Sequence, residues 1–193
     1  MLLKRSPRSK SAPRSSPLEP SPTIAIIGAG PLGRSLALRA ARAGFRVFLE
    51  DVMPSNLHHA QELIRQELSA AALPAVAFVS TVEDAVRSAD LILDCVPDEL
   101  ESKLEILWLL DRMAPPHAVF ATPTTTQSIA DLAQCTYRPD KCIAIAAEPA
   151  ALARAEGPST QLRITAATAP EAVALVDRFW RALGLEPVFE IVR

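Results

Sequence analysis

Short apolar runs alternate with stretches of helical spacing along most of the chain. The first run, TIAIIG, covers residues 23–28 and precedes a helical stretch from Pro31 to about Ala43, with Gly44 as its stop. A second apolar run covers residues 45–50. Runs of this length favour buried strands, and the segment between them has helical periodicity. The order predicts a βαβ unit.

The same alternation continues to the end of the chain. Apolar runs over 75–80, 91–96, 118–122, 140–149, 161–166 and 187–192 predict strands. The spacing predicts helices behind a Ser55 cap, over 82–87 and 99–113, and from Pro170 to about Leu183, with an Ala-rich loop before residue 161. Near-continuous apolar strands separated by helices predict an α/β fold. We therefore expect a Rossmann-type, doubly wound, mostly parallel sheet in a single domain over residues 23–193.

The first 22 residues have a different composition. They contain five prolines and many serines, and residues 1–20 carry five basic side chains against Glu19 alone, a balance of +4 within a total of −2. Such a segment lacks the apolar area for a core, so we expect a disordered basic tail. An organelle-targeting segment is the alternative, although the prolines disfavour the amphipathic helix that it would need.

Composition excludes several other classes of protein. The chain has 193 residues, of which 49% are hydrophobic and 22% charged, which is typical of an ordinary soluble globular protein. We expect no nucleic-acid partner and, with no apolar run of membrane-spanning length, a cytoplasmic protein without membrane spans. The three cysteines, Cys95, Cys135 and Cys142, have no metal-ligand spacing, so we expect reduced thiols and no metal.

The chemistry centres on the sequence GAGPLG, in which Pro31 and Leu32 separate the last two glycines. It follows a predicted strand and opens a helix, which is the context of a dinucleotide-binding fingerprint. Gly28 would allow the tight turn, Gly30 the approach of a pyrophosphate, and Gly33 the close packing of helix and sheet.

An acidic pair, Glu50 and Asp51, closes the next predicted strand. Asp51 is placed to accept hydrogen bonds from the adenosine ribose, while Glu50 fits a solvated strand end better than a ligand. Two carboxylates and no nearby arginine would repel a 2′-phosphate, so NAD is favoured over NADP.

From about Thr23 onward the chain resembles the NAD-binding domain of the 3-hydroxyacyl-CoA dehydrogenase family. IAIIGAGPLG, EDAVRSADLILDCVPDELESKLEIL, VFATPTTTQSIADLA and RPDKCIAIAAEP carry the resemblance in order, and APEAVALVDRFWRALGLEPV fits the last helix and strand. The resemblance implies NAD as cofactor and adds contacts for it: Pro97, Asp98, Lys103 and Thr125, the last also meeting substrate. Asp98 and Lys103 could instead be the solvated start of a helix, and Thr125 an ordinary strand-end residue.

One departure removes the family's base. Where the family has the histidine that takes the hydroxyl proton, this chain has Ala146, with one residue fewer before Pro149. The glutamate that orients that histidine falls near Gln161, or less well at Glu156. The remaining candidates for proton transfer are three histidines, expected at the surface, and one thiol, expected inside the sheet: His58, His59, His117 and Cys142.

A second departure concerns the substrate side of the site. The family's helical substrate domain would begin where this sequence ends, and Arg65 is the only cation where the family holds coenzyme A. Two hypotheses follow. The chain is an NAD-binding pseudoenzyme related to fatty acid metabolism, or it is an active dehydrogenase. An active enzyme would take a 3-hydroxyacyl-CoA completed by a separate helical subunit, or another small hydroxy substrate with Thr125 and a water in the proton path.

Overall fold

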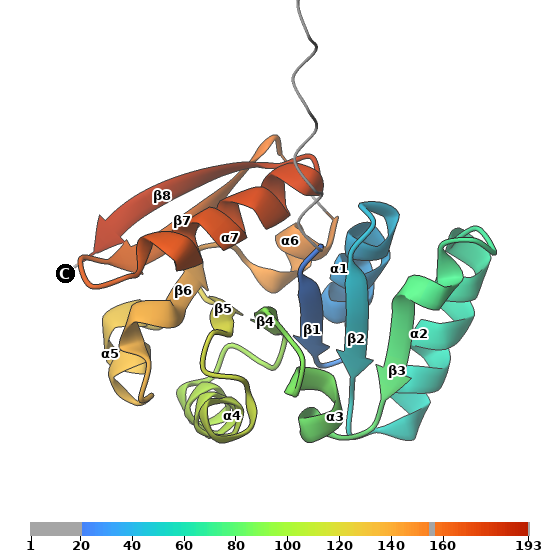
Figure 1. Ribbon diagram of the computed structural model, residues 1–193, viewed down its shortest axis with the longest axis horizontal. Helices are drawn as coiled ribbons and strands as arrows, with labels where there is room; N and C mark the ends of the chain where they lie inside the picture. Colours follow the sequence, from blue (N-terminus) through green and yellow to red (C-terminus); the bar gives the residue numbers. More distant parts are fainter. Residues whose placement is uncertain (1–20, 155–156, 193) are drawn as a thin grey trace, which may run out of the picture.

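The computed structural model describes residues 21–154 and 157–192, and its strands form one sheet with the order β3-β2-β1-β4-β5-β6-β7-β8 (Figure 1). Neighbouring strands are parallel except β6 and β7, which are antiparallel. The strands are β1 (Thr23–Ile27), β2 (Arg46–Glu50), β3 (Val76–Val79), β4 (Leu91–Asp94), β5 (Val119–Pro123), β6 (Cys142–Ile145), β7 (Ser159–Thr165) and β8 (Glu186–Val192). The predicted doubly wound, mostly parallel α/β fold is confirmed.

Helices cover both faces of this sheet (Figure 1). One face packs against α1 (Pro31–Arg42), α2 (Pro54–Glu67), α6 (Pro149–Arg154) and α7 (Pro170–Ala182). The other packs against α3 (Val82–Val86), α4 (Leu100–Met113) and α5 (Ile129–Gln134). Two 3-10 turns, η1 (Leu73–Ala75) and η2 (Pro139–Lys141), precede β3 and β6.

Alternation within each strand divides the core between the two faces. Ile24 and Ile26 of β1 join the cluster on the α1 side, whereas Ala25 and Ile27 join the cluster on the α4 side. Successive strand side chains point to opposite faces, so a strand buried on both sides must be apolar throughout. Each large apolar side chain fully buried in this way contributes about 1.5–3 kcal/mol.

Three local expectations need correction or lie outside the structure. Helix α2 begins at Pro54 with Met53 as its N-cap, not behind Ser55, because proline is well suited to the first helical position. The predicted Ala-rich loop contains α6, which again starts at a proline and continues through alanines of high helix propensity. The predicted tail lies outside the described residues except for Ser21 and Pro22.

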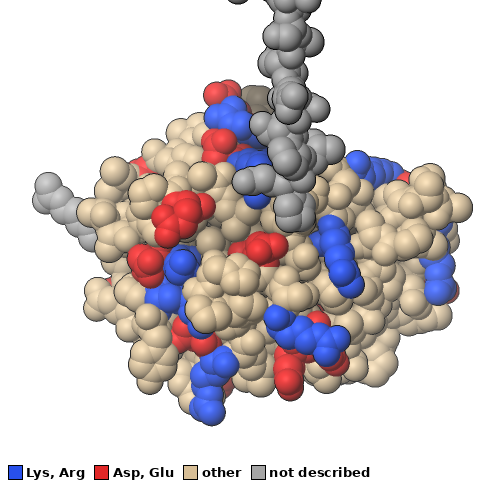
Figure 2. All heavy atoms as spheres, viewed as in Figure 1, with Lys and Arg blue, Asp and Glu red and all other residues tan. Residues whose placement is uncertain are grey.

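Charged groups are mixed over the face of the molecule seen in Figure 2. There, Lys and Arg side chains lie among Asp and Glu without a continuous area of one sign. Within residues 21–154 and 157–192, no helix has the length and apolar character needed to cross a membrane.

Candidate functional site

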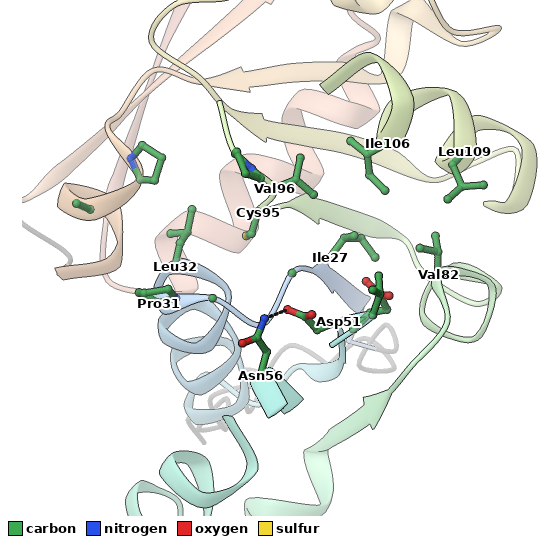
Figure 3. A pocket seen from close by; sticks show the side chains of 17 residues that line it. Ile27, Pro31, Leu32, Asp51, Asn56, Val82, Cys95, Val96, Ile106 and Leu109 are labelled. Atoms are coloured by element: carbon green, nitrogen blue, oxygen red, sulfur yellow. Dashed lines mark hydrogen bonds between the residues drawn. The ribbon is translucent and has the colours of Figure 1, made fainter. Parts of the chain in front are cut away.

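A cavity of about 660 Å³ opens at the carboxyl ends of the central strands. It lies beside β1, β2 and β4, where the sheet order reverses direction between β1 and β4. In doubly wound sheets, this reversal leaves a crevice because the connections leave the two strands in opposite directions. We call it the switch-point cavity. Figure 3 shows it running from Pro31 and Leu32 past Asp51 toward Val82 and Leu109.

The three glycines of GAGPLG have different structural roles. Gly28 has a φ of +101°, which an L side chain rarely adopts. A Cβ on Gly33 would lie 1.9 Å from the carbonyl oxygen of Gly28, so helix α1 can approach the turn only if this residue is glycine. A Cβ on Gly30 would meet nothing within 4 Å. Gly28 and Gly33 therefore build the turn, and Gly30 keeps the space in front of it open.

The amino terminus of α1 presents an uncapped helix end to this space. Gly30 is its N-cap and supplies no side-chain hydrogen bond, Pro31 follows, and the first turn carries no acidic side chain. Gly30, Pro31 and Leu32 all line the cavity. Free N–H groups and the positive end of the helix dipole favour an anion here.

Asp51 lies at the end of β2 and is tied to the glycine turn. Its Oδ2 accepts hydrogen bonds from the backbone N–H of Ala29 at 2.8 Å and from the side chain of Asn56 at 3.0 Å (Figure 3). Its Oδ1 accepts from the backbone N–H of Met53 at 2.8 Å. A carboxylate has about four lone-pair positions. Asp51 thus retains acceptor capacity toward the cavity while its orientation is fixed.

Glu50 is not the solvated strand end that the sequence indicated, because its side chain is only 2% exposed. It lines the cavity, and its Oε1 is buried without a hydrogen-bond partner. Burial, and then the charge of Asp51, raise the pKa of Glu50 to about 7. The pairing of Glu50 with Ile27 explains the burial, since paired residues of parallel strands point to the same face of the sheet.

Lys103 is buried as well, which corrects its alternative placement at a solvated helix start. Its Nζ donates to Asp94 Oδ2 at 3.1 Å and to the carbonyl oxygen of Val96 at 3.3 Å. The hydroxyl of Thr122 donates to the same Asp94 oxygen at 2.8 Å. Lys103 does not line the cavity; it fixes the segment after β4, of which Val96 and Pro97 do line it. Sequence reasoning missed Asp94, although an acidic residue closing an apolar strand was a visible signal.

A second polar group bridges the loops after β4, β5 and β6. Asp98 Oδ2 accepts hydrogen bonds from the backbone N–H of Thr125 at 3.0 Å and from the hydroxyl of Thr126 at 3.3 Å. The hydroxyl of Thr125 donates to Glu148 Oε1 at 3.1 Å. Burial pushes the pKa of Asp98 upward, but hydrogen bonds from Thr124, Thr125 and Thr126 and the charge of Lys103 hold it below its ordinary value. Asp98 and Thr125 are thus brought together.

Ala146 follows β6, and Gln161, one of the two candidate positions for the family's glutamate, lies beside it. The backbone N–H of Ala146 donates to the carbonyl oxygen of Gln161 at 2.8 Å. The amide side chain of Gln161 donates instead to Glu190 at 3.3 Å. Glu156, the other candidate at this position, lies outside the described residues.

The remaining candidates for proton transfer are remote or inert. All three histidines are exposed, as expected. His58 pairs with Glu62 on α2, and His117 lies before β5, at the opposite end of the strand from the cavity. Cys142 is buried in β6, and burial raises the pKa of its thiol to about 11. Cys95 does line the cavity, where burial raises the pKa of its thiol well above the ordinary value.

Comparison with protein families gives a match over most of the chain. The family described as "3-hydroxyacyl-CoA dehydrogenase, NAD binding domain" matches residues 23–190. This range contains the glycine turn, the end of β2 and the polar groups after β4, β5 and β6.

Individual relatives match at lower coverage of their own length. A probable 3-hydroxybutyryl-CoA dehydrogenase of Bacillus subtilis is 29% identical over 62% of this chain and 46% of that protein. An L-carnitine dehydrogenase of Burkholderia mallei is 31% identical over 86% of this chain and 54% of that protein. A 3-hydroxyacyl-CoA dehydrogenase structure from Archaeoglobus fulgidus matches with a TM-score of 0.74 and 26% identity, over 89% of this chain and 57% of that one. The chain spans about half the length of the curated relatives it matches.

Proposed function

Because the chain belongs to the family of 3-hydroxyacyl-CoA dehydrogenase NAD-binding domains, whose cofactor is NAD, we propose that it binds NAD in the switch-point cavity and is impaired as a dehydrogenase. The observation that carries the binding half is the open space in front of Gly30 beside an uncapped helix end. The observation that carries the impairment is Ala146 at the end of β6.

The residues of the cavity fit a dinucleotide piece by piece. The pyrophosphate would meet Gly30, Pro31 and Leu32 at the start of α1, where N–H groups are free. The adenosine ribose would meet Asp51, which has acceptor capacity left. Of the other predicted contacts, Pro97 lines the cavity and would meet the remainder of the cofactor, whereas Asp98, Lys103 and Thr125 do not line it. Asp98 and Thr125 would meet the cofactor only where it extends beyond the cavity, and Lys103 would act through Val96.

The cofactor preference follows from charge. Glu50 and Asp51 both line the cavity, whereas none of its described lining residues is Lys, Arg or His. A 2′-phosphate placed near Asp51 would meet a carboxylate without a compensating cation. We therefore propose that NAD binds in preference to NADP.

Impairment follows from the missing proton acceptor. Bound NAD would supply a hydride acceptor, but oxidation of an alcohol also requires removal of the hydroxyl proton. A positioned general base contributes about a hundred- to ten-thousandfold in rate. Ala146 has no ionisable group, and the described histidines lie elsewhere. This supports a binding or regulatory role for the chain.

A second candidate is an active dehydrogenase with a different base. The contact of 3.1 Å between Thr125 and Glu148 favours it, because a carboxylate beside a hydroxyl is a proton-transfer pair. In this alternative the substrate is a 3-hydroxyacyl-CoA, completed by a separate helical subunit, or another small hydroxy compound. The matched relatives carry the names of enzymes for different substrates, so the substrate does not follow from them.

The experiment has two stages, binding and turnover. Calorimetry should first give a saturable NAD affinity for the 193-residue protein and a weaker one for NADP. NADH formation from 3-hydroxybutyryl-CoA is then measured for wild type, Ala146→His and the control Ala147→His. We expect turnover at least a hundredfold below the ~10 per second typical of enzymes, with little gain in either variant, since an imidazole acts only when oriented.

Two results would decide against impairment. Wild-type turnover near the typical enzyme value contradicts it directly. If Glu148→Gln then abolishes that turnover, Glu148 is the base and the second candidate holds. Absence of NAD binding contradicts both candidates.

A further inference from the structure

We propose that Glu50 recognises the adenine base of the dinucleotide, its carboxyl group pairing with the exocyclic amine and an adjacent ring nitrogen. The proposal rests on NAD binding in the switch-point cavity and gives Glu50 a direct contact with the cofactor, to which the proposed function assigns none.

The position of Glu50 in the sheet places it in the apolar half of the cavity. It pairs with Ile27 on one side and with Val79 on the other. Ile27 belongs to the core cluster on the α4 side, and Val79 packs against the same cluster. Paired residues of parallel strands point to the same face, so the Glu50 carboxyl lies on that face too.

The walls around this half of the cavity are apolar. Val82 comes from α3, Ile106 and Leu109 from α4, and Val96 from the segment after β4. Figure 3 shows Val82, Ile106 and Leu109 on the side of Asp51 away from Pro31 and Leu32. With the pyrophosphate at Pro31 and the ribose at Asp51, the base is the part of the dinucleotide that extends in this direction.

One oxygen of the carboxyl group lacks a hydrogen-bond partner among the residues that the structure describes. Its Oε1 is buried without a hydrogen bond, although buried polar atoms nearly always have one. Asp51 and Cys95 are the other titratable residues among the described lining, and α3 and α4 contribute only apolar side chains to it. On the far side of Ile27, Asp94 is already paired with Lys103. Within the described part of the cavity lining, no cation is thus available to hold Glu50 in its charged form.

A neutral carboxyl group matches adenine by its hydrogen-bonding pattern. Its carbonyl oxygen accepts from the exocyclic amine, and its O–H donates to the adjacent ring nitrogen, so both polar groups of the acid are satisfied. Phosphate would be repelled by the charged form, and the ribose is served by Asp51. Among the adenine, ribose and phosphate groups of the dinucleotide, only adenine combines an apolar ring face, which can pack against Val82 and Ile106, with a hydrogen-bonding edge for Glu50.

This pairing makes NAD affinity depend on pH in a defined direction. The binding form is protonated, and burial and the charge of Asp51 place the pKa of Glu50 near 7. Affinity should therefore be highest below pH 7 and fall as the pH rises above it. Loss of the donated hydrogen bond corresponds to about a tenfold change in affinity.

The test uses the full chain with NAD and with ADP-ribose, which keeps the adenosine and the pyrophosphate and lacks only the nicotinamide. Dissociation constants are measured by calorimetry from pH 6 to pH 9 for wild type, Glu50→Gln, Glu50→Met and, as control, Glu62→Gln on the exposed face of α2. Glutamine keeps an acceptor and a donor at every pH, whereas methionine keeps neither. Thermal melts establish that each variant is folded.

We expect the NAD affinity of wild type and of Glu62→Gln to fall about tenfold from pH 6 to pH 9. Glu50→Gln should bind NAD with little pH dependence. Glu50→Met should bind NAD about tenfold more weakly than wild type at pH 6. Both ligands should show the same changes. The proposal is overturned if Glu50→Met binds as tightly as wild type at pH 6, if Glu50→Gln keeps the wild-type pH profile, or if ADP-ribose shows none of the changes seen with NAD. If neither wild type nor any variant binds NAD at any pH, the proposed function is overturned as well. If wild type binds NAD but the Glu50 variants behave like wild type, only the Glu50 assignment fails.

Discussion

Replacing two glycines of GAGPLG one at a time should separate folding from binding. Gly33→Ala adds a methyl group where the Gly28 carbonyl oxygen lies 1.9 Å away. Gly30→Ala adds the same methyl group where nothing lies within 4 Å, at a backbone φ of −66° that any residue adopts. The two variants differ by no charge and no hydrogen-bonding group. We expect the first to lose stability and the second to lose NAD affinity.

The distances set the size of each effect. Ordinary van der Waals contact begins at 3.4 Å, so in Gly33→Ala the turn and α1 must separate by about 1.5 Å (3.4 − 1.9). Both are backbone segments in a close-packed core, and relieving such an overlap lowers the free energy of unfolding by about 1–3 kcal/mol or more. In Gly30→Ala the free energy of unfolding falls by a smaller amount, about 0.5–1 kcal/mol, because Gly is preferred over Ala at helix N-caps. Its methyl group displaces the pyrophosphate, and loss of one or two hydrogen bonds to a charged group weakens NAD binding by about tenfold or more.

Urea denaturation and calorimetric NAD titration of both variants provide the measurements. A Gly33→Ala protein as stable as wild type would show that the turn and helix are not in contact as described. A Gly30→Ala protein that binds NAD with wild-type affinity would show that the cofactor does not approach this glycine, and would remove the main support for the binding mode.

Three further substitutions test the surroundings of the cavity. Asp51→Ala should weaken NAD binding by about tenfold and reduce the preference for NAD over NADP, as measured by calorimetry. If wild type binds NADP as tightly as NAD or more tightly, the argument from charge is wrong. Lys103→Met leaves the buried Asp94 without its cation and should lower the free energy of unfolding by about 3–5 kcal/mol. Adding Asp94→Asn should restore part of this loss. A loss below about 1 kcal/mol in urea denaturation would contradict the buried ion pair. Because the pKa of Glu50 is raised from 4.5 to about 7, wild type should lose stability between these pH values and Glu50→Gln should not. At pH 8 thermal melts should show Glu50→Gln to be more stable than wild type by about 1–2 kcal/mol, a range that allows for solvent screening at the cavity. If both proteins show the same dependence of stability on pH, the Glu50 carboxyl is not buried.

The elements nearest the glycine turn could be predicted because local rules decide them. Gly28 needs a positive φ, Gly33 needs close approach, and Pro31 suits the start of a helix, all of which depend on a few neighbouring residues. Asp51 follows from its place at the end of the next strand. The strand alternation likewise predicted the sheet, since buried parallel strands must be apolar on both faces.

The residues that were misplaced depend on contacts that are remote in sequence. For Lys103 the sequence predicted an NAD contact, with a solvated helix start as the alternative, whereas in the fold β4 brings Asp94 to its amine and β5 brings Thr122 to the same Asp94 oxygen. Glu50 reads as a solvated strand end until β1, β3, α3 and α4 close around it. Charged residues are rarely buried without a partner, so a single sequence favours exposure for Glu50 and does not predict the buried pair of Lys103.

The proposed cofactor-binding region and the position of the proton acceptor differ in how many substitutions would abolish each of them. The proposed binding region depends mainly on backbone: the turn requires Gly28 and Gly33, the helix end is uncapped, and backbone N–H groups of Ala29 and Met53 fix the Asp51 carboxylate. Its shape is part of the folding of β1 and α1, so any folded sequence of this kind retains much of it. In the proposed function, proton transfer would depend on one side chain after β6, and an alanine there leaves the backbone pairing of Ala146 with Gln161 intact. The proposed loss of the base is therefore compatible with the fold that the chain keeps, and the proposed Glu50 contact would add a pH dependence to cofactor binding.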